Sequence, residues 1–176
     1  MTHSARNPLR IDIARHVWQS RYRFSESETG AEPDINATWA RIAAACAAVE
    51  GDNAGRWQTA YMEAMQDFRF LPAGRILAGT GTGAQVTLFN CFVMGLIEDS
   101  LEGICRILEE SALTMQQGGG IGLDFSTLRP RGSPAKGVGR IASGPVSFMH
   151  VWAAMCDTLA STSGRGGAMM ATLRCD

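Results

Sequence analysis

Glycine constrains the fold of this chain more than any other residue type, because most of its 20 glycines fall into four clusters. Glycine permits tight turns and close backbone approaches, so each cluster marks a break between regular elements. The clusters occupy residues 79–83, 118–122, 132–144 and 164–167. The segments between them alternate between strand-like and helical apolar patterns. The predicted strands cover residues 85–95, 121–125 and 169–175, and the predicted helices cover residues 99–115 and 149–159.

This alternation predicts a parallel sheet, and therefore an α/β fold, for residues 85–176. The first predicted strand is apolar on both faces, which is typical of a strand buried between two layers. Three strands neither close a barrel nor form a sheet that is covered on both sides. We therefore expect the natural fold to continue beyond Asp176, and the alternative is a small three-stranded domain.

The first 84 residues have a different pattern. Residues 1–33 are polar and predict a solvated amino-terminal arm, whereas residues 34–84 predict an all-helical region. Apolar residues recur at helical spacing in residues 35–49 and again in residues 57–68. Asp34 or Asn36 can cap the first of these helices, and the helical pair ends at Pro72.

Charge and cysteine usage exclude several classes of function. The net charge of −1 provides no broad basic field for nucleic acid, and no apolar run approaches the ~20 residues of a membrane span. The five cysteines lie far apart without a Cys-x-x-Cys pair, so no metal site is expected. An odd number of cysteines without a secretory signal favours reduced thiols in the cytoplasm.

Three glycine-rich motifs have both a structural and a functional interpretation. Residues 79–84 fit the dinucleotide-binding fingerprint, but a strand-like segment follows where that fingerprint needs a helix, so we reject an NAD site. Residues 118–120 are three consecutive glycines, and because one glycine is enough for a helix cap, the run favours close approach of a ligand. Residues 129–140 combine cations with glycines, and residue type alone does not distinguish a phosphate-binding loop from a solvated one.

Three cysteines lie within apolar patterns. Cys91 is in the middle of the first predicted strand, and Cys105 and Cys156 lie on apolar faces of the predicted helices. Because buried cysteine is the commoner case for such patterns, all three are predicted to belong to the core.

Seven motifs follow one another in a specific order and spacing. They are RFLPAGRILAG at 69–79, NCFV at 90–93, DSL at 99–101, GGGIG at 118–122, LRPRGSP at 128–134, SGPVSFM at 143–149 and RGGAMM at 165–170. Taken together, they resemble the catalytic chain of adenosylcobalamin-dependent (class II) ribonucleotide reductases. The resemblance extends from residue 12 to the last residue.

The resemblance implies a helical amino-terminal region followed by a ten-stranded α/β barrel, of which residues 85–176 would form the first part. It implies reduction of a ribonucleotide to a 2′-deoxyribonucleotide by an adenosylcobalamin-dependent ribonucleoside-diphosphate reductase. In this chemistry a cobalamin-derived radical produces a cysteine thiyl, the thiyl removes the 3′-hydrogen, and a cysteine pair supplies two electrons. The motifs themselves do not distinguish a diphosphate from a triphosphate substrate.

The resemblance also assigns roles to individual residues. Cys91 matches the first cysteine of the reducing pair and is the candidate catalytic residue. The matched substrate-pocket positions are Ala73, Gly74, Asn90, Cys91, Gly119 and Gly120. Relatives often carry a hydroxyl residue at the position of Ala73 and Gly74, which this chain lacks. The matched effector-binding positions are Asp99, Arg129, Arg131 and Lys136, and we expect Asp99 also to cap its helix.

The family's thiyl cysteine, second reducing cysteine and cobalamin-holding region have no match in this chain, so we expect the chain alone to make no deoxynucleotide. The implied partners are a ribonucleotide substrate, a deoxynucleotide or ATP effector, a thioredoxin-type reductant and a second copy of the chain. Neither nucleic acid nor membrane is expected as a partner. Two alternatives are a non-catalytic deoxynucleotide-binding module and a partner that completes the barrel of another reductase chain. The pocket positions at 90–91 and 118–120 favour the reductase fragment.

Overall fold

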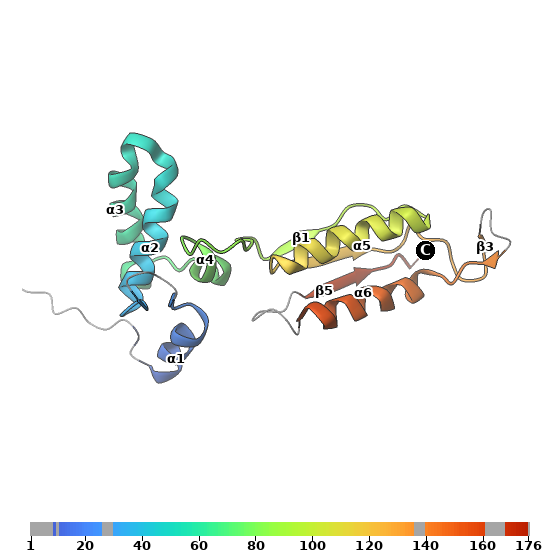
Figure 1. Ribbon diagram of the computed structural model, residues 1–176, viewed down its shortest axis with the longest axis horizontal. Helices are drawn as coiled ribbons and strands as arrows, with labels where there is room; N and C mark the ends of the chain where they lie inside the picture. The colour runs from blue at the N-terminus through green and yellow to red at the C-terminus, as the bar shows by residue number, and fades with distance from the viewer. Residues whose placement is uncertain (1–8, 10, 26–29, 136–139, 161–167, 176) are drawn as a thin grey trace, which may run out of the picture. The chain divides into compact units, whose positions relative to one another are not determined.

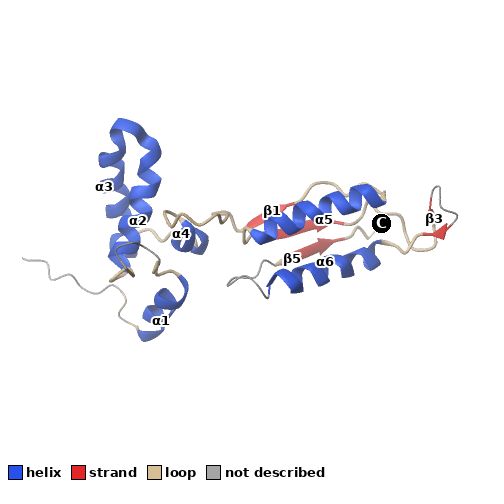
Figure 2. Ribbon diagram, viewed as in Figure 1, coloured by secondary structure: helices blue, strands red, loops and turns tan. Residues whose placement is uncertain are grey.

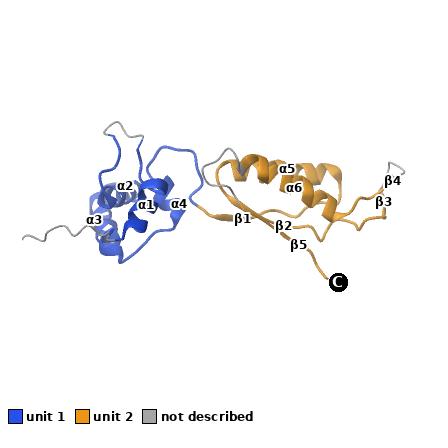
Figure 3. Ribbon diagram, turned by 90° about the horizontal axis from the view of Figure 1, so that it is seen from below, with its two compact units in different colours: residues 1–88 blue, residues 89–176 orange. Residues whose placement is uncertain are grey.

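The computed structural model describes residues 9, 11–25, 30–135, 140–160 and 168–175. The chain divides into two compact units, Met1–Leu88 and Phe89–Asp176 (Figure 3). Each unit has its own apolar core, so each is described separately. No helix in these described ranges is long and apolar enough to cross a membrane.

The first unit is helical (Figure 1). The predicted helical pair is present as α2 (Ile35–Ala47) and α3 (Ala54–Met65), joined by the 3-10 turn η1 (Ala48–Asn53). Asp34 caps α2, because its Oδ1 accepts hydrogen bonds from the backbone N–H groups of Asn36 (2.9 Å) and Ala37 (3.1 Å). After α3, the 3-10 turn η2 (Gln66–Phe68) has positive φ angles at Asp67 and Phe68. The predicted second helix therefore ends earlier than expected.

Two further helices in this unit were not predicted individually, although the second lies within the region 34–84 that was predicted to be all-helical. They are α1 (Asp12–Arg21) and the six-residue α4 (Gly74–Gly79). Trp18 of α1 is buried, and its Nε1 donates a hydrogen bond of 2.9 Å to Thr38 Oγ1. The interpretation of the first residues as a solvated arm is therefore wrong for Trp18, whose side chain is part of the core, while the rest of α1 is largely exposed.

The second unit contains a three-stranded parallel sheet with two helices (Figure 2). The strands are β1 (Cys91–Val93), β2 (Gly120–Asp124) and β5 (Met169–Thr172), in the order β1-β2-β5. The helices α5 (Leu101–Gln116) and α6 (Pro145–Ala160) lie on the same face of this sheet (Figure 3). The α/β class with parallel strands is thus confirmed, and the sheet is not closed.

The core of the second unit lies between the sheet and the two helices. Trp152 of α6 and Phe125 after β2 are fully buried, with their rings edge to face at 5.3 Å. Trp152 Nε1 donates a hydrogen bond of 3.1 Å to Ser111 Oγ of α5. Around this centre pack the other buried apolar residues, Ile97, Ile104, Ile107, Met115, Ile121, Leu123 and Leu128.

The opposite face of the sheet carries no helix among the described elements. Successive strand residues point to opposite faces, and because Ile121 and Leu123 point into the core, Gly120 and Gly122 lie on the other face. Cys91 and Val93 are paired with these two glycines. We call this surface the open face of the sheet. Met170, which is 65% exposed and paired with Gly122, is on the same face.

The strand prediction for residues 85–95 is wrong in extent and in burial. Only Cys91–Val93 form a strand, and Val86, Leu88, Phe89 and Val93 are exposed. The physical reason is that β1 is an edge strand of the described sheet and only one of its faces is covered. Apolar residues alternate onto both faces of this segment, but a layer of helices covers only one of those faces in the described structure.

Candidate functional site

Cys91 lies on the open face of the sheet, where its side chain is exposed. The prediction that this cysteine belongs to the core is therefore wrong. Its strand partner is Gly120, and a Cβ added at Gly120 would lie only 3.5 Å from Cys91 Sγ. The same Cβ would lie 3.2 Å from Ala168 O and 3.3 Å from Asn90 O. Gly120 is itself buried, and a side chain at this position would crowd the thiol and both carbonyls, so glycine lets the backbone lie close to Cys91.

The run of three glycines has a structural role at each position. Gly118 has a φ of 87°, and its N–H donates to Met115 O (2.8 Å) while the N–H of Gly119 donates to Thr114 O (3.0 Å), the hydrogen-bond pattern of a Schellman cap. At Gly119 an added Cβ would lie 2.8 Å from the Phe92 ring. The cap and strand packing therefore explain the run, so it no longer argues for a ligand by itself.

Asn90 and Gly120 are brought together at the beginning of the sheet. The N–H of Gly120 donates a hydrogen bond of 2.8 Å to the carbonyl of Asn90. This bond fixes the backbone on either side of Cys91. Of the predicted pocket residues, the structure therefore groups Asn90, Cys91, Gly119 and Gly120 within one unit. Ala73 and Gly74 belong to the other unit, where Ala73 is the N-cap of α4 and Gly74 is its first residue.

The predicted effector residues Asp99 and Arg129 contact each other directly. Arg129 Nε donates to Asp99 Oδ2 at 2.7 Å, its backbone N–H donates to Asp99 Oδ1 at 3.3 Å, and Nη2 donates to Asp99 O at 3.1 Å. A fourth hydrogen bond joins Arg129 Nη1 to Pro134 O at 2.8 Å. Asp99 does not cap α5, because Ser100 does: its Oγ accepts a hydrogen bond of 3.0 Å from Gly103 N. The expected capping role of Asp99 is therefore wrong, and its carboxylate orients Arg129 instead.

A groove of about 480 Å³ lies beside this ion pair. Asp99, Arg129 and Ser143 contribute polar groups, and Leu101, Ile104, Leu128 and Phe148 contribute apolar surface. Next to it a short antiparallel hairpin of β3 (Pro134–Ala135) and β4 (Arg140–Ile141) forms within the predicted anion-binding loop. Arg131 is exposed in this loop, and Lys136 lies outside the described residues.

The remaining cysteines have different environments. Cys105 is exposed on α5, so its prediction as a core residue is wrong, whereas Cys156 is half-buried. Burial raises the pKa of the Cys156 thiol, with a further contribution from the negative charge of Asp157. Cys156 Sγ lies 3.4 Å from Met115 Sδ in the core. Cys156 is thus a packing residue, while Cys91 is on the open face of the sheet.

At the carboxyl end of β2, Asp124 accepts hydrogen bonds from the hydroxyl (2.5 Å) and the N–H (3.0 Å) of Ser126. These two bonds, the hydroxyl first, lower the pKa of the Asp124 carboxyl. Ser126 Oγ also accepts a hydrogen bond of 2.8 Å from Arg174 N beyond β5. No pattern in the sequence singled out this cluster, in which the Asp124–Ser126 contacts are local and only the Arg174 contact joins two strand ends.

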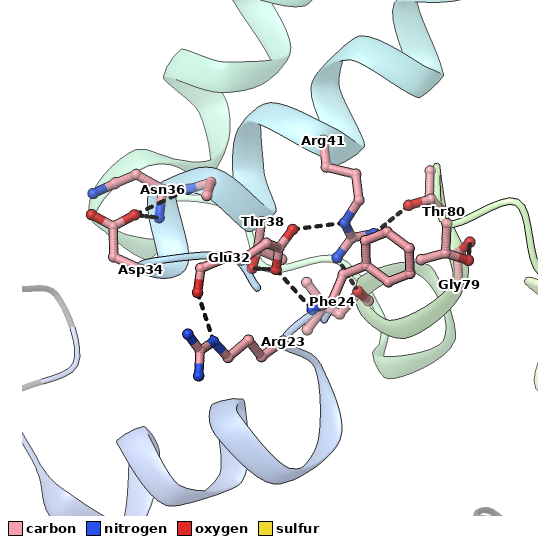
Figure 4. Close-up of polar contacts among 12 residues, drawn as sticks. Arg23, Phe24, Glu32, Asp34, Asn36, Thr38, Arg41, Gly79 and Thr80 are labelled. Carbon is pink, nitrogen blue, oxygen red and sulfur yellow. Dashed lines mark hydrogen bonds and ion pairs between the residues drawn. The ribbon is translucent and has the colours of Figure 1, made fainter. Parts of the chain in front are cut away.

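No pattern singled out the buried ion pair of Glu32 and Arg41 in the first unit either (Figure 4). The available signal was that Arg41 is the only charged residue of α2. Its Nε lies 2.8 Å from Glu32 Oε1.

Among the described residues, no group of three or more histidine, cysteine, aspartate or glutamate side chains could hold a metal ion.

Comparison with known proteins identifies the family. Residues 89–176 match the barrel domain of ribonucleotide reductase, and residues 10–85 match its all-alpha domain. The chain belongs to the ribonucleotide reductase family. The two matches fall on the two compact units of the structure, so the open-faced sheet with Cys91 is part of a reductase barrel domain.

Among the relatives of this reductase chain, vitamin B12-dependent enzymes are similar over most of its length. The vitamin B12-dependent ribonucleoside-diphosphate reductase of Mycobacterium tuberculosis is 33% identical over 96% of this chain and 24% of the relative. The enzyme of the same name from Thermoplasma acidophilum is 36% identical over 70% of the chain and 16% of the relative. The large subunit of the Vaccinia virus ribonucleoside-diphosphate reductase is 37% identical over 40% of the chain. The chain spans at most about a quarter of the length of these curated relatives.

Proposed function

We propose that this chain supplies part of the catalytic chain of a vitamin B12-dependent ribonucleoside-diphosphate reductase, with Cys91 as one of its two reducing thiols. The observation that carries the proposal is the position of Cys91, exposed on the open face of the sheet beside Gly120. In an α/β barrel whose helices cover the outside, this face becomes the interior that holds the substrate. The proposal includes the ten-stranded barrel, of which the described sheet provides three strands.

The chemistry requires two thiols that contact each other beside the 2′-carbon of the ribose. Each thiol gives one electron and one proton, a disulfide forms, and the 2′-hydroxyl leaves as water while hydrogen takes its place on the ribose. The exposed Cys91 thiol is suited to this role, because no side chain at Gly120 crowds it and both a ribose and a second thiol can approach it from the open face. The hydrogen bond from Gly120 N to Asn90 O restrains the backbone that carries the thiol.

The remaining assignments extend this proposal. Asn90, Gly119 and Gly120 would line the substrate pocket with Cys91, and Ala73 and Gly74 would contribute from the all-alpha domain. Thioredoxin-type reduction of the resulting disulfide fits a cytoplasmic protein with free cysteines. Adenosylcobalamin would supply the radical in the complete enzyme. We assign no residue of this chain to the cofactor.

The effector site is a second element of the proposal. Asp99 holds the Arg129 guanidinium at the edge of the groove beside the hairpin, and Arg129, Arg131 and Lys136 would provide cations for the phosphates of a deoxynucleotide or ATP. A non-catalytic deoxynucleotide-binding module is the competing function that this groove favours. A purely binding role would leave the position of Cys91 unexplained.

Two experiments test these roles. In the complete reductase chain that carries this sequence, Cys91→Ser should abolish repeated turnover with adenosylcobalamin and a dithiol. Cys105→Ser, which changes another exposed cysteine, should retain turnover. Turnover by Cys91→Ser at the unmodified rate would overturn the catalytic proposal. For the effector site, Arg129→Ala should weaken deoxynucleotide binding in equilibrium titrations, whereas the control Arg56→Ala on α3 should not; equal affinities would exclude Arg129 from the site.

A further inference from the structure

The buried ion pair of Glu32 and Arg41 has no role in the chemistry described above. Arg41 Nε and Glu32 Oε1 lie 2.8 Å apart, and the two side chains are only 10% and 9% exposed. Burying two charges carries a desolvation penalty that their mutual attraction often does not offset. Stability of the all-alpha unit is therefore a weak explanation for this ion pair.

The other hydrogen bonds of Arg41 reach the end of α4. Nη2 donates to Leu77 O at 3.0 Å and Nη1 donates to Thr80 O (Figure 4). The last carbonyls of a helix have no partner within the helix, and a cation is favourable at this end of the helix dipole. Gly81, with a φ of 71°, lets the chain pass close to Arg41, since an added Cβ would lie 3.0 Å from Arg41 Cγ. Arg41 thus attaches the carboxyl end of α4 to α2.

Glu32 fixes the orientation of Arg41. One carboxylate oxygen pairs with Arg41, while the other accepts hydrogen bonds from Thr38 Oγ1 (2.6 Å) and Phe24 N (3.1 Å) (Figure 4). Arg23 Nε donates a further bond of 2.6 Å to the carbonyl of Glu32. The carboxylate is therefore held from α2 and from the segment before it, which leaves the guanidinium one orientation.

The conformation of α4 depends on such tertiary contacts. It has six residues, and isolated helices shorter than ~12–15 residues are marginal in water. At a rise of 1.5 Å per residue the helix is only about 9 Å long, so a fixed carboxyl end also determines where its first residues lie. The N-cap Ala73 and the first helical residue Gly74 lie there, and the proposed function assigns both to the substrate pocket.

We propose that Glu32 and Arg41 are positioning residues of the reductase. They hold α4 so that Ala73 and Gly74 keep the position in which they contact the ribonucleotide. This inference rests on the proposed function. Arg41 acts through the backbone of α4 and does not itself touch the substrate.

The test uses steady-state kinetics of the complete reductase chain that carries these residues. Arg41→Gln should raise the KM for the ribonucleotide about tenfold while kcat at saturating substrate changes less than about twofold, because uniform binding is lost and not chemistry. Arg41→Lys, which keeps the charge but not the planar fork, should recover part of the KM. Arg56→Gln, the matched control on the exposed side of α3, should leave both constants unchanged.

Amide hydrogen exchange measures the attachment itself in the same variants. In Arg41→Gln the N–H of Thr80, which donates to Ile76 O at 3.1 Å, should exchange faster, while amides within α2 keep their protection. An unchanged KM in Arg41→Gln would overturn the inference, whether or not kcat falls. A lower kcat at an unchanged KM is the result expected when the substitution merely reduces the amount of folded enzyme. Failure of the unmodified enzyme to make deoxynucleotide would instead overturn the proposed function, and the exchange rates would still decide whether Arg41 holds α4.

Discussion

Substitution of Gly119 by alanine tests the close packing that places β1, and with it Cys91, on the sheet. The new Cβ would lie 2.8 and 2.9 Å from two atoms of the Phe92 ring and 2.9 Å from the Thr114 methyl group. These contacts are about 0.7 Å shorter than the ~3.5 Å at which carbon atoms attract each other. The Phe92 ring also lies edge to face with the Phe89 ring, with the centroids 6.4 Å apart, so relieving the new contact disturbs this ring pair as well. Overpacking of this kind costs about 1–3 kcal/mol of unfolding free energy.

The matched control is Gly122→Ala, three residues further along the chain and on the open face. Its Cβ would meet only Phe92 O at 3.9 Å, so we expect a change within about 0.5 kcal/mol. With a denaturant slope of ~1–3 kcal/mol per molar urea, Gly119→Ala should lower the urea midpoint of the second unit by about 1 M relative to the control. Trp152, fully buried in that unit, provides a specific probe when the chain is labelled with 5-fluorotryptophan and followed by fluorine NMR. Equal midpoints for the two variants would refute the packing argument.

Two further predictions concern polar groups. Thr38→Val should destabilise the first unit by about 1–3 kcal/mol, because it removes the hydroxyl that accepts from Trp18 Nε1 and donates to Glu32 and so leaves buried polar groups unpaired; urea unfolding followed by tryptophan fluorescence measures this, and an unchanged midpoint would contradict it. Ser126→Ala should raise the pKa of Asp124 toward the ordinary aspartate value, because the hydroxyl and its bond to the carboxylate are lost. A carboxyl whose pKa is lower in the folded protein than in the unfolded chain stabilises the fold at a pH above the unfolded pKa, and this contribution disappears as the pH falls through the folded pKa. The Ser126→Ala variant should therefore lose less stability on acidification than the unmodified protein. A carboxyl carbon NMR titration that gives the same Asp124 pKa in both proteins would contradict the assignment.

The sequence predicted the order of elements in the second unit but not their exposure. Helical periodicity identified α5 and α6, and the glycine clusters identified the breaks between elements. Cys91 was predicted to be buried because the pattern around it is apolar on both sides. Whether a second layer covers an apolar strand is a property of the assembled sheet, so residue pattern alone could not decide it.

Short elements and isolated side chains account for most of the remaining differences. Helix α4 spans six residues and the strands of the β3–β4 hairpin span two each, which is too short for a periodic signal. In α1 a single buried tryptophan, Trp18, lies within a segment rich in charged residues. The contact between Asp99 and Arg129 joins residues 30 positions apart. In the sequence, only the resemblance to a known family assigned these two residues to the same site.

The central claim, that Cys91 is a reducing thiol of a ribonucleotide reductase, is tested most directly by counting oxidised Cys91 during a single turnover. The complete, prereduced reductase chain is mixed with adenosylcobalamin and a ribonucleoside diphosphate without external dithiol, quenched in acid and alkylated, and the peptides are quantified by mass spectrometry. We expect Cys91 to lose its alkylation in proportion to the deoxynucleotide formed, one disulfide for each product molecule, while Cys105 remains alkylated. Formation of deoxynucleotide with Cys91 still fully alkylated would contradict the account.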